Sequence, residues 1–375
     1  MGASARGRIV HVMLSDRPWG IVKVVSGLAK VQARDGEVWV AANKDLEPML
    51  DLDPSIRFLR LPIEFKGSWP TTMTMLRSLR QYESAAEILD SMEARVMHFH
   101  LPNALAVANL SRSGAPRVYT VHGFFYENRL LRGLEPVLTP LAMRRASAIT
   151  CISRYALRPD WMVSRAKVIP NGIDGRVVDE LAMDESGPEF KEVRSLKEKG
   201  RGPIVIFPAN LVIRKGQELA MRCVPTLVKT LPHALMVFVG DGPDKDKLIR
   251  LSKELGVQES VSFMGFVKNP YPLMRLSDLV LSHLTSSWPL PSLVELEAMH
   301  LGKRVITGYT EEKASLYGDG ARFLRKEEGP ELAKEIVRAL ESAPPLHDGA
   351  GNGSRFEWES ISKDYEAVYR RAESA

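Results

Sequence analysis

The sequence predicts an α/β protein with two Rossmann-like domains, each built on a parallel sheet. Short β-branched and apolar runs alternate with longer helical patterns along the whole chain, which is typical of βαβ units. The length of 375 residues exceeds what a single hydrophobic core normally supports. Residues 175–202, rich in charge and glycine, separate two sets of runs and are interpreted as a linker with a surface helix. We therefore expect domains 1–177 and 178–355.

The apolar runs define the expected strands. In the N-terminal domain they are 8–14, 37–42, 56–61, 96–100, 117–122, 148–152 and 167–169. In the C-terminal domain they are 204–208, 234–240, 260–264, 278–282, 304–307 and 321–324. After a Pro- and Gly-dense loop at 343–354, apolar residues at helical spacing predict an amphipathic terminal helix: Phe356, Trp358, Ile361, Tyr365, Val368 and Tyr369.

The composition, 45% apolar and 26% charged residues, is that of a soluble globular protein. No apolar run approaches the roughly 20 residues that span a bilayer, and no leader-like segment is recognised, so we expect a cytoplasmic protein. Cys151 and Cys223 are too few and too far apart for a disulfide scaffold or a zinc site. The net charge of +5 suits solubility, or an anionic partner such as a nucleoside diphosphate or an acidic membrane. Nucleic acid is not an expected partner.

The first chemical motif lies in Pro208–Gln217, where Arg214, Lys215 and Gly216 follow an expected strand and precede an expected helix. Basic side chains beside a helix N-terminus offer charge and amide donors to a diphosphate. Gly216 permits close approach of the backbone. The alternative is that two basic residues merely solvate a loop.

A second motif, Gly240 and Gly242 after a strongly apolar strand, predicts a tight turn between strand and helix. It is not the G-x-G-x-x-G dinucleotide fingerprint, and the loop after the first strand has only Gly20. A nicotinamide oxidoreductase is therefore disfavoured.

The third motif, 286–302, follows a buried strand and opens a helix near Ser292. Backbone amides of Ser292, Leu293 and Val294 could bind phosphate or sugar oxygens. Glu297, further along this helix, could accept hydrogen bonds from ribose hydroxyls. The alternative for Glu297 is a solvated helix face.

The order of these motifs, with VIPNGID at Val168–Asp174, resembles one family: the retaining, glycogen-synthase-like glycosyltransferases of the B-type fold (GT-B), family 4. The likeness covers nearly the whole chain and is strongest from Val168 to Gly308. It implies two Rossmann-like domains facing across a cleft. It also implies that the C-terminal helix, 356–375, returns to the N-terminal domain.

The resemblance assigns roles to the motifs. It implies that Lys215, helped by Arg214, binds the donor diphosphate, and that Glu297 holds the ribose. The backbone at Gly265 and Phe266 would line the nucleobase. The remaining donor-side positions are Gly20, Asn171, Gly172, Asn210, Gly216, Gly240, Gly242, Ser292, Leu293 and Val294.

His122, in YTVHGF, matches the family's histidine at the end of a strand, which lies beside the donor sugar. The alternative is a core histidine. His100 could border the cleft, whereas His98 is expected to pack. A metal site made from these three histidines is disfavoured, because the B-type fold works without one; no metal or other cofactor is expected.

Two positions depart from the family pattern. Pro289 stands where the first glutamate of the paired-glutamate motif belongs, and Glu295 lies on a different helix face from Glu297. Asn210 stands where an arginine precedes the phosphate-binding lysine, and Arg214 is the neighbouring residue that could supply this charge.

The expected activity is transfer of a hexose from a nucleoside-diphosphate sugar to a glycan, lipid-linked or small-molecule hydroxyl, with retention. The alternatives are a catalytically impaired sugar-binding or partner subunit, and an epimerase. Segments 64–82 and 124–145 mix aromatic, apolar and basic residues, which suits peripheral contact with an anionic membrane at its inner face. Packing on their own domain is the equal alternative.

Overall fold

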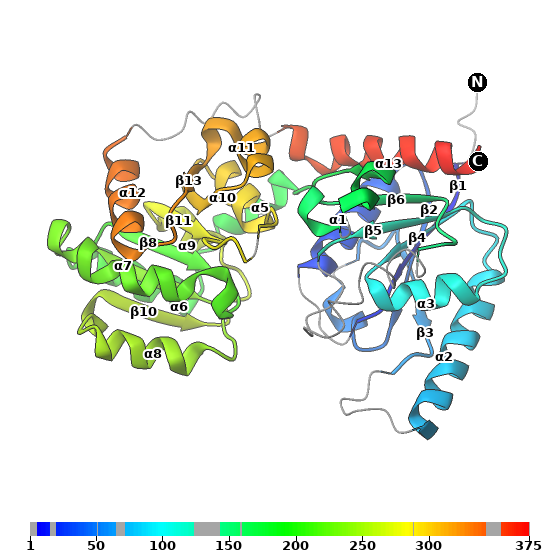
Figure 1. The fold of residues 1–375 in the computed structure, drawn as a ribbon, viewed down its shortest axis with the longest axis horizontal. Helices are drawn as coiled ribbons and strands as arrows, with labels where there is room; N and C mark the ends of the chain where they lie inside the picture. The colour runs from blue at the N-terminus through cyan, green and yellow to red at the C-terminus, as the bar shows by residue number, and fades with distance from the viewer. Residues whose placement is uncertain are drawn as a thin grey trace. The chain divides into compact units, whose positions relative to one another are not determined.

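The computed structural model describes residues 6–15, 20–50, 52–64, 72–123, 143–157, 160–287, 289–342 and 354–374. The chain forms two compact units (Figure 1). Unit 1 comprises Met1–Gly172 and Trp358–Ala375, and unit 2 comprises Ile173–Glu357.

Unit 1 contains a parallel sheet in the order β3-β2-β1-β4-β5-β6-β7. Its strands are β1 (Arg6–Met13), β2 (Gly36–Asn43), β3 (Arg57–Leu61), β4 (Val96–His100), β5 (Arg117–Val121), β6 (Ala148–Cys151) and β7 (Ala166–Val168). Its described α-helices are α1 (Ile21–Gln32), α2 (Thr72–Asp90), α3 (Pro102–Leu110) and α13 (Trp358–Glu373). The strand order reverses between β1 and β4, and ligands of doubly wound sheets bind beyond the carboxyl ends of strands at such a switch point.

Unit 2 contains a parallel sheet in the order β10-β9-β8-β11-β12-β13, which reverses between β8 and β11. Its strands are β8 (Ile204–Pro208), β9 (Leu235–Val239), β10 (Val261–Gly265), β11 (Leu279–Ser282), β12 (Arg304–Gly308) and β13 (Arg322–Leu324). Its described α-helices are α5 (Gly175–Ala182), α6 (Pro188–Glu198), α7 (Gln217–Thr230), α8 (Lys245–Glu254), α9 (Tyr271–Leu276), α10 (Leu293–His300), α11 (Glu311–Tyr317) and α12 (Gly329–Glu341).

Every expected strand is present, with ends that differ from the prediction by no more than two residues. The reason is that strands of a parallel sheet covered on both faces are apolar along their whole length. All residues of β8 and of β9 are buried, for example. The fold class predicted from the alternation of runs is therefore confirmed.

The segment 175–202 differs from the prediction, because it is not a linker. It forms α5 and α6, which bury Val178, Phe190 and Val193 against Ile204 and Ile206 of β8. Asp174 caps α5 by accepting a hydrogen bond from the amide of Val177 (3.2 Å). The expected boundary at 177/178 thus falls inside α5, and the chain divides between Gly172 and Ile173 instead.

The expected terminal helix is α13, which packs on α1, β5 and β6 of unit 1 (Figure 1). It buries the predicted apolar stripe from Trp358 to Tyr369. Phe356 is the exception, because it lies in the core of unit 2 with Tyr317. The change of unit thus occurs between Phe356 and Trp358.

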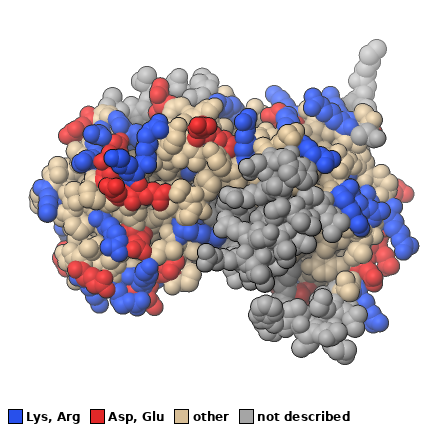
Figure 2. Space-filling view, viewed as in Figure 1, with Lys and Arg blue, Asp and Glu red and all other residues tan. Residues whose placement is uncertain are grey.

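Several sequence predictions concern residues outside the described part of the chain: most of the loop 343–354, residues 65–71 of the first proposed membrane segment, and 124–142 of the second. Among the described helices, none is both long and apolar enough to cross a bilayer. On the face of unit 2 seen in Figure 2, basic and acidic side chains are interspersed. Among the surface charges of unit 2, Arg194 pairs with Glu185 (2.9 Å).

Candidate active site

In unit 2 the loop after β9 packs directly on the loop after β8. The amide of Leu211 donates to the carbonyl of Asp241 (3.0 Å), and the amide of Asp244 donates to the carbonyl of Leu211 (3.2 Å). A Cβ atom at Gly240 would overlap the carbonyl of Ala209, and Gly240 has a φ of +142°. A Cβ atom at Gly242 would overlap the carbonyl of Leu211. Packing between the two loops is therefore sufficient reason for both glycines.

The Arg214–Lys215–Gly216 motif forms a single 3₁₀ turn, η4 (Ile213–Lys215), directly before α7. Gly216 has a left-handed φ of +96°, and a Cβ atom there would lie 2.7 Å from the Cβ of Leu284. Leu284, from the loop after β11, donates its amide to the carbonyl of Lys215 (3.0 Å). The motif thus lies where the loops after β8 and β11 meet, at the switch point of the sheet.

Lys215 is half-buried. The pKa of its ammonium is lowered to about 8, mainly by burial and in addition by the positive charge of Arg214. Because the charged form is disfavoured in the free protein, an anion that pairs with Lys215 would restore it. A diphosphate at the N-terminus of α7 fits this requirement.

His283 is a further buried residue that feels the charge of Lys215. It follows β11, is buried, and has a strained φ of +41°. Burial holds its pKa well below the ordinary value, and the charges of Lys215 and Lys313 act in the same direction. His283 was not among the predicted site residues, although it follows β11 as His122 follows β5.

The N-terminus of α10 is closed by a capping box. The Ser292 hydroxyl accepts from the amide of Glu295 (3.2 Å), and the amide of Ser292 donates to the Glu295 carboxylate (3.0 Å). Of the three predicted amide donors, Ser292 is therefore already engaged. The amides of Leu293 and Val294 belong to the first turn, which has no helical carbonyl to bond.

Glu297, on the same helix, is only 5% exposed. Its carboxylate accepts a hydrogen bond from the Tyr271 hydroxyl of α9 (2.8 Å). The solvated-face alternative for Glu297 is therefore wrong. Burial raises the pKa of Tyr271, and the neighbouring Glu297 carboxylate raises it further.

Gly265 and Phe266 stand at the carboxyl end of β10. The carbonyl of Gly265 accepts the amide of Gly240 (2.7 Å), so these two loops are joined by their backbones. Phe266 is 74% exposed, which leaves its ring open to stacking on a planar ligand.

In unit 1 the two predicted glycines lie at separate places. Gly20 is exposed and directly precedes α1. Gly172 is buried, and a Cβ atom there would lie 2.6 Å from the Trp358 indole of α13. Gly172 is therefore required by the packing of α13 within unit 1.

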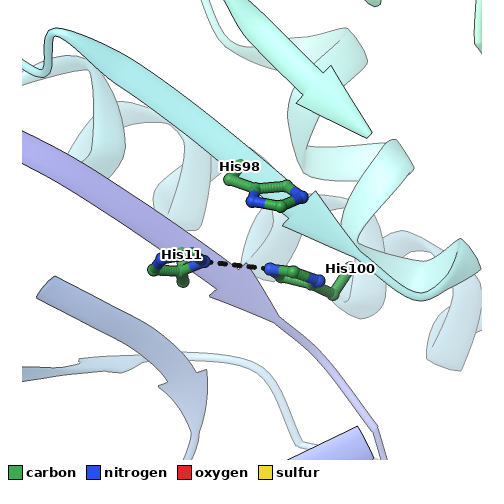
Figure 3. Close-up of side chains that lie close together, drawn as sticks. All are labelled: His11, His98 and His100. Carbon is green, nitrogen blue, oxygen red and sulfur yellow. Dashed lines mark hydrogen bonds between the residues drawn. The ribbon is translucent and has the colours of Figure 1, made fainter. Parts of the chain in front are cut away.

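His122 belongs to a buried polar layer between the sheet of unit 1 and the helices α1 and α13. His11 of β1 lies beside His98 of β4 in the sheet register, and His100 is two residues further along β4, on the same face. Figure 3 shows the three rings close together, with His11 hydrogen-bonded to His100. Thr120, opposite His100, and His122 continue this face along β5 and just beyond its end.

These histidines are neutral near pH 7. Burial lowers the pKa of His11 to about 4 and that of His122 to about 3. Burial also holds the pKa values of His98 and His100 well below the ordinary one, and neighbouring histidines contribute in the same direction. The prediction that His98 packs in the core is confirmed, since it has no exposed surface.

The ring nitrogens of His11, His98 and His100 lie close enough together to hold a metal ion. However, all of them already bond to protein groups. The partners outside this trio are Gln32, Tyr369, Thr120 and His122. The arrangement is therefore a hydrogen-bond network, in which a metal would have to displace existing bonds.

A hollow of 660 Å³ lies elsewhere on unit 1, between α1, α13 and the amino end of β1. Gly7, Gln32, Glu366 and Arg370 are among its lining residues. It lies at the opposite end of β1 from the carboxyl edge, where doubly wound sheets bind their ligands. We therefore do not assign the donor to it.

Two family sequence models match the chain. "Glycosyltransferase Family 4" matches residues 19–176, and "Glycosyl transferases group 1" matches residues 189–355. The chain belongs to glycosyltransferase family 4. Its two parallel-sheet units are those of the family's B-type fold.

Solved structures agree with this fold. Anabaena HepE in complex with UDP and glucose superposes with a TM-score of 0.75 at 20% identity, covering 97% of this chain and 100% of that one. Sucrose-phosphate synthase from Thermosynechococcus elongatus gives a TM-score of 0.72 at 15% identity, covering 98% and 99%. At these identities the likeness establishes architecture alone.

Matches of this family 4 chain to its curated relatives cover smaller shares of both proteins. EpsD of Bacillus subtilis is 26% identical over 263 residues, which is 65% of this chain and 64% of that protein. A GDP-mannose-dependent phosphatidylinositol monomannoside mannosyltransferase of Mycolicibacterium smegmatis is 31% identical over 175 residues, 43% of this chain and 42% of that protein. The match thus spans less than two thirds of each of these relatives.

This chain departs from the paired-glutamate motif of the family at Pro289, where the first glutamate belongs. Glu295 does not replace that glutamate. Glu295 has no exposed surface, and its carboxylate accepts from Thr307 (2.6 Å), Tyr317 (2.6 Å) and Lys313 (3.1 Å). These bonds lie inside unit 2. At the second departure, the carbonyl of Asn210 accepts from the Gln217 side chain (2.8 Å), which fixes the loop before Lys215.

Proposed function

We propose that this family 4 chain transfers a hexose from a nucleoside-diphosphate sugar to a hydroxyl acceptor, with retention at the anomeric carbon. The observation that carries the proposal is the environment of Lys215. Its half-buried ammonium has a pKa lowered to about 8 and lies beside the N-terminus of α7, at the switch point of a parallel sheet. Such a site gains most from an anionic ligand.

The diphosphate would be held by Lys215, Arg214 and first-turn amides rather than by a metal ion. The loops after β8 and β11 support this, because they are tied by Leu284 to Lys215 and by the Thr285 and Ser287 hydroxyls to the carbonyl of Arg214. The amides of Leu293 and Val294 follow in the same stretch of chain. Positive charge fixed in this way stabilises the leaving nucleotide as the glycosyl bond breaks.

The reaction proposed is substitution on one face of the sugar. The bond from the anomeric carbon to the phosphate oxygen breaks, and a bond to the acceptor oxygen forms on the same face. The acceptor's hydroxyl proton passes to an oxygen of the departing phosphate. This sequence requires no protein nucleophile.

Glu297 and Phe266 are proposed to bind the nucleoside. Glu297 is buried and held by Tyr271, which gives its carboxylate a fixed position for ribose hydroxyls. Phe266 offers an exposed ring to the base. HepE has been solved in complex with UDP and with UDP-glucose, which makes UDP the first nucleotide to test.

The acceptor is proposed to be a glycan, a lipid-linked sugar or a small molecule. The names of two relatives contain the name of a lipid. They are the mycobacterial mannosyltransferase and the alpha-monoglucosyldiacylglycerol synthase of Acholeplasma laidlawii, which is 23% identical over 347 residues. Lipid-linked acceptors are therefore the first class to test.

The experiment begins with thermal stabilisation of the purified chain by UDP, GDP and ADP, and then by their sugars. The Lys215→Ala variant is expected to lose the shift given by the preferred nucleotide, whereas Lys199→Ala, a lysine outside the site, keeps it. Turnover is then measured as nucleotide release with a panel of acceptors, and NMR of the product reports the anomeric configuration. An unchanged shift in Lys215→Ala would refute the donor-site assignment.

Pro289 favours one second candidate, a sugar-binding or partner subunit without turnover. Its position lacks the family glutamate, and Glu295 is committed to Lys313. The subunit alternative predicts nucleotide binding with no nucleotide release for any acceptor. Retained turnover would exclude it.

A further inference from the structure

A continuous chain of hydrogen bonds leads from His122 into the interior of unit 1. His122 Nε2 lies 2.9 Å from His100 Nδ1, and His100 Nε2 lies 3.0 Å from His11 Nδ1. His11 Nε2 lies 2.7 Å from Gln32 Oε1 at the end of α1. His100 and His11 have no exposed surface, and Gln32 is 6% exposed, at the edge of the hollow on unit 1.

Gln32 determines which atom donates and which accepts in each of these hydrogen bonds. Its Nε2 donates to the Tyr369 hydroxyl of α13 (3.2 Å), so its Oε1 faces His11. A carbonyl oxygen only accepts, and His11 Nε2 must therefore carry the hydrogen. Since a neutral imidazole has one N–H, His11 Nδ1 is then an acceptor.

The same reasoning applies to the next two histidines in the row of residues from Gln32 to His122. His100 Nε2 donates to His11 Nδ1, which leaves His100 Nδ1 as an acceptor. His122 Nε2 donates to His100 Nδ1, which leaves His122 Nδ1 unprotonated. Among the described residues, none bonds to this last nitrogen.

The rest of the polar layer agrees with this direction. The Tyr369 hydroxyl, having accepted from Gln32, donates to His98 Nδ1 (2.8 Å). His98 Nε2 then donates to the Thr120 hydroxyl (2.6 Å), and Thr120 donates to Thr150 (2.6 Å). Apart from His122, each ring and each hydroxyl of this layer thus gives one hydrogen and accepts one, so these buried polar groups are satisfied together.

We propose that His100, His11 and Gln32 are positioning residues that hold His122 as the neutral Nε2–H tautomer, with Nδ1 as a fixed hydrogen-bond acceptor. The group that His122 Nδ1 meets must then be a hydrogen-bond donor, a role that a hydroxyl fills. A phosphate or carbonyl oxygen would face a bare lone pair and is disfavoured. If the proposed transferase function holds, this group is a hydroxyl of the sugar.

The tautomers can be read directly, without activity. In long-range ¹H–¹⁵N NMR spectra of histidine-labelled protein, His122, His100, His11 and His98 are expected as Nε2–H tautomers at pH 7. Assignments come from single His→Gln variants. An Nδ1–H tautomer or a charged ring at His122 would overturn the proposal. This readout stands even if no nucleotide sugar is turned over.

The functional test compares two substitutions at one position. His100→Gln can donate its amide to His11 and accept from His122, whereas His100→Leu can do neither. With a sugar donor that is turned over, His100→Leu is expected to lower kcat/KM by about tenfold, and His100→Gln by less than about threefold. Equal losses in two variants that melt alike would contradict the positioning role.

Two further variants separate positioning from general damage to the layer. Tyr365→Phe removes a buried hydroxyl that lies 3.5 Å from Thr120, outside the row from His122 to Gln32, and is expected to keep the kcat/KM of the parent. In a His122→Ala background, His100→Leu is expected to cause no further loss of kcat/KM. A loss that adds fully to that of His122→Ala would show that His100 acts independently.

Discussion

Glu295 and Lys313 form an ion pair (3.1 Å) in which the side chains are 0% and 1% exposed. The pair is closed off by Thr307, which donates to Glu295 (2.6 Å), and Lys313 donates in turn to Thr307 (2.8 Å). Removing one partner would leave an isolated buried charge, which is costly in a protein interior.

Lys313→Met is accordingly expected to lower the free energy of unfolding of unit 2 by about 3–5 kcal/mol. The double variant Glu295→Gln, Lys313→Met removes both charges and is expected to regain most of that loss. Urea unfolding monitored by circular dichroism measures both. A double variant as unstable as Lys313→Met would show that the lost lysine packing, not the unpaired carboxylate, dominates.

The lowered pKa of Lys215, about 8, predicts how nucleotide affinity depends on pH. Above this pH the free protein loses the lysine charge, so binding a diphosphate must restore a proton. Affinity for the preferred nucleotide should therefore fall by up to about tenfold for each pH unit between 8 and 10. Isothermal titration calorimetry gives the dissociation constants. Lys215→Arg, which stays charged, should bind with little change over this range.

Trp358 and Gly172 provide a stability test within unit 1. Gly172→Ala would bring a methyl group against the Trp358 indole, and such overpacking typically costs about 1–3 kcal/mol. The Gly172→Ala, Trp358→Leu pair should show a smaller penalty for the alanine, because the smaller side chain leaves room for it. Thermal melting of the four proteins of the cycle measures the coupling. Additive effects would mean that the two residues do not compete for space.

Buried neutral histidines predict a loss of stability in acid. The folded pKa of His11 is about 4, below the ordinary 6.5, so the unfolded chain binds the proton first as the pH falls. The stabilising contribution is complete above about pH 6.5 and is lost as the pH falls towards 4. Between pH 7 and 5 the loss for His11 is expected to be about 2 kcal/mol. Urea unfolding of the parent and His11→Gln at both pH values checks it, and equal pH dependences would contradict it.

The strands and the motif positions could be predicted because their signals are local. A parallel strand is apolar along its length, and Lys215 and His122 each follow such a run. Residues such as Gln32, His11 and Lys313 could not be assigned roles, because their partners are distant in sequence. Gln32 bonds to Tyr369, 337 residues away, and nothing near Gln32 indicates this.

The structure differs from the prediction at two other places, and there too the cause is packing that local sequence does not show. The high charge of 175–202 concealed the narrow apolar faces of α5 and α6, which bury Val178 and Phe190. The burial of Glu297 depends on Tyr271 in another helix, so helical spacing alone could not distinguish it from a solvated residue.

The position of α13 affects how the protein is assembled during translation. Residues 1–172 leave the ribosome long before Tyr365 and Tyr369, because the whole of unit 2 is synthesised in between. Until α13 arrives, the nascent sheet holds four imidazoles on a face that lacks one of its two covering helices. Unit 2 is contiguous and can fold as it emerges, so unit 1 begins to emerge before unit 2 but is completed after it.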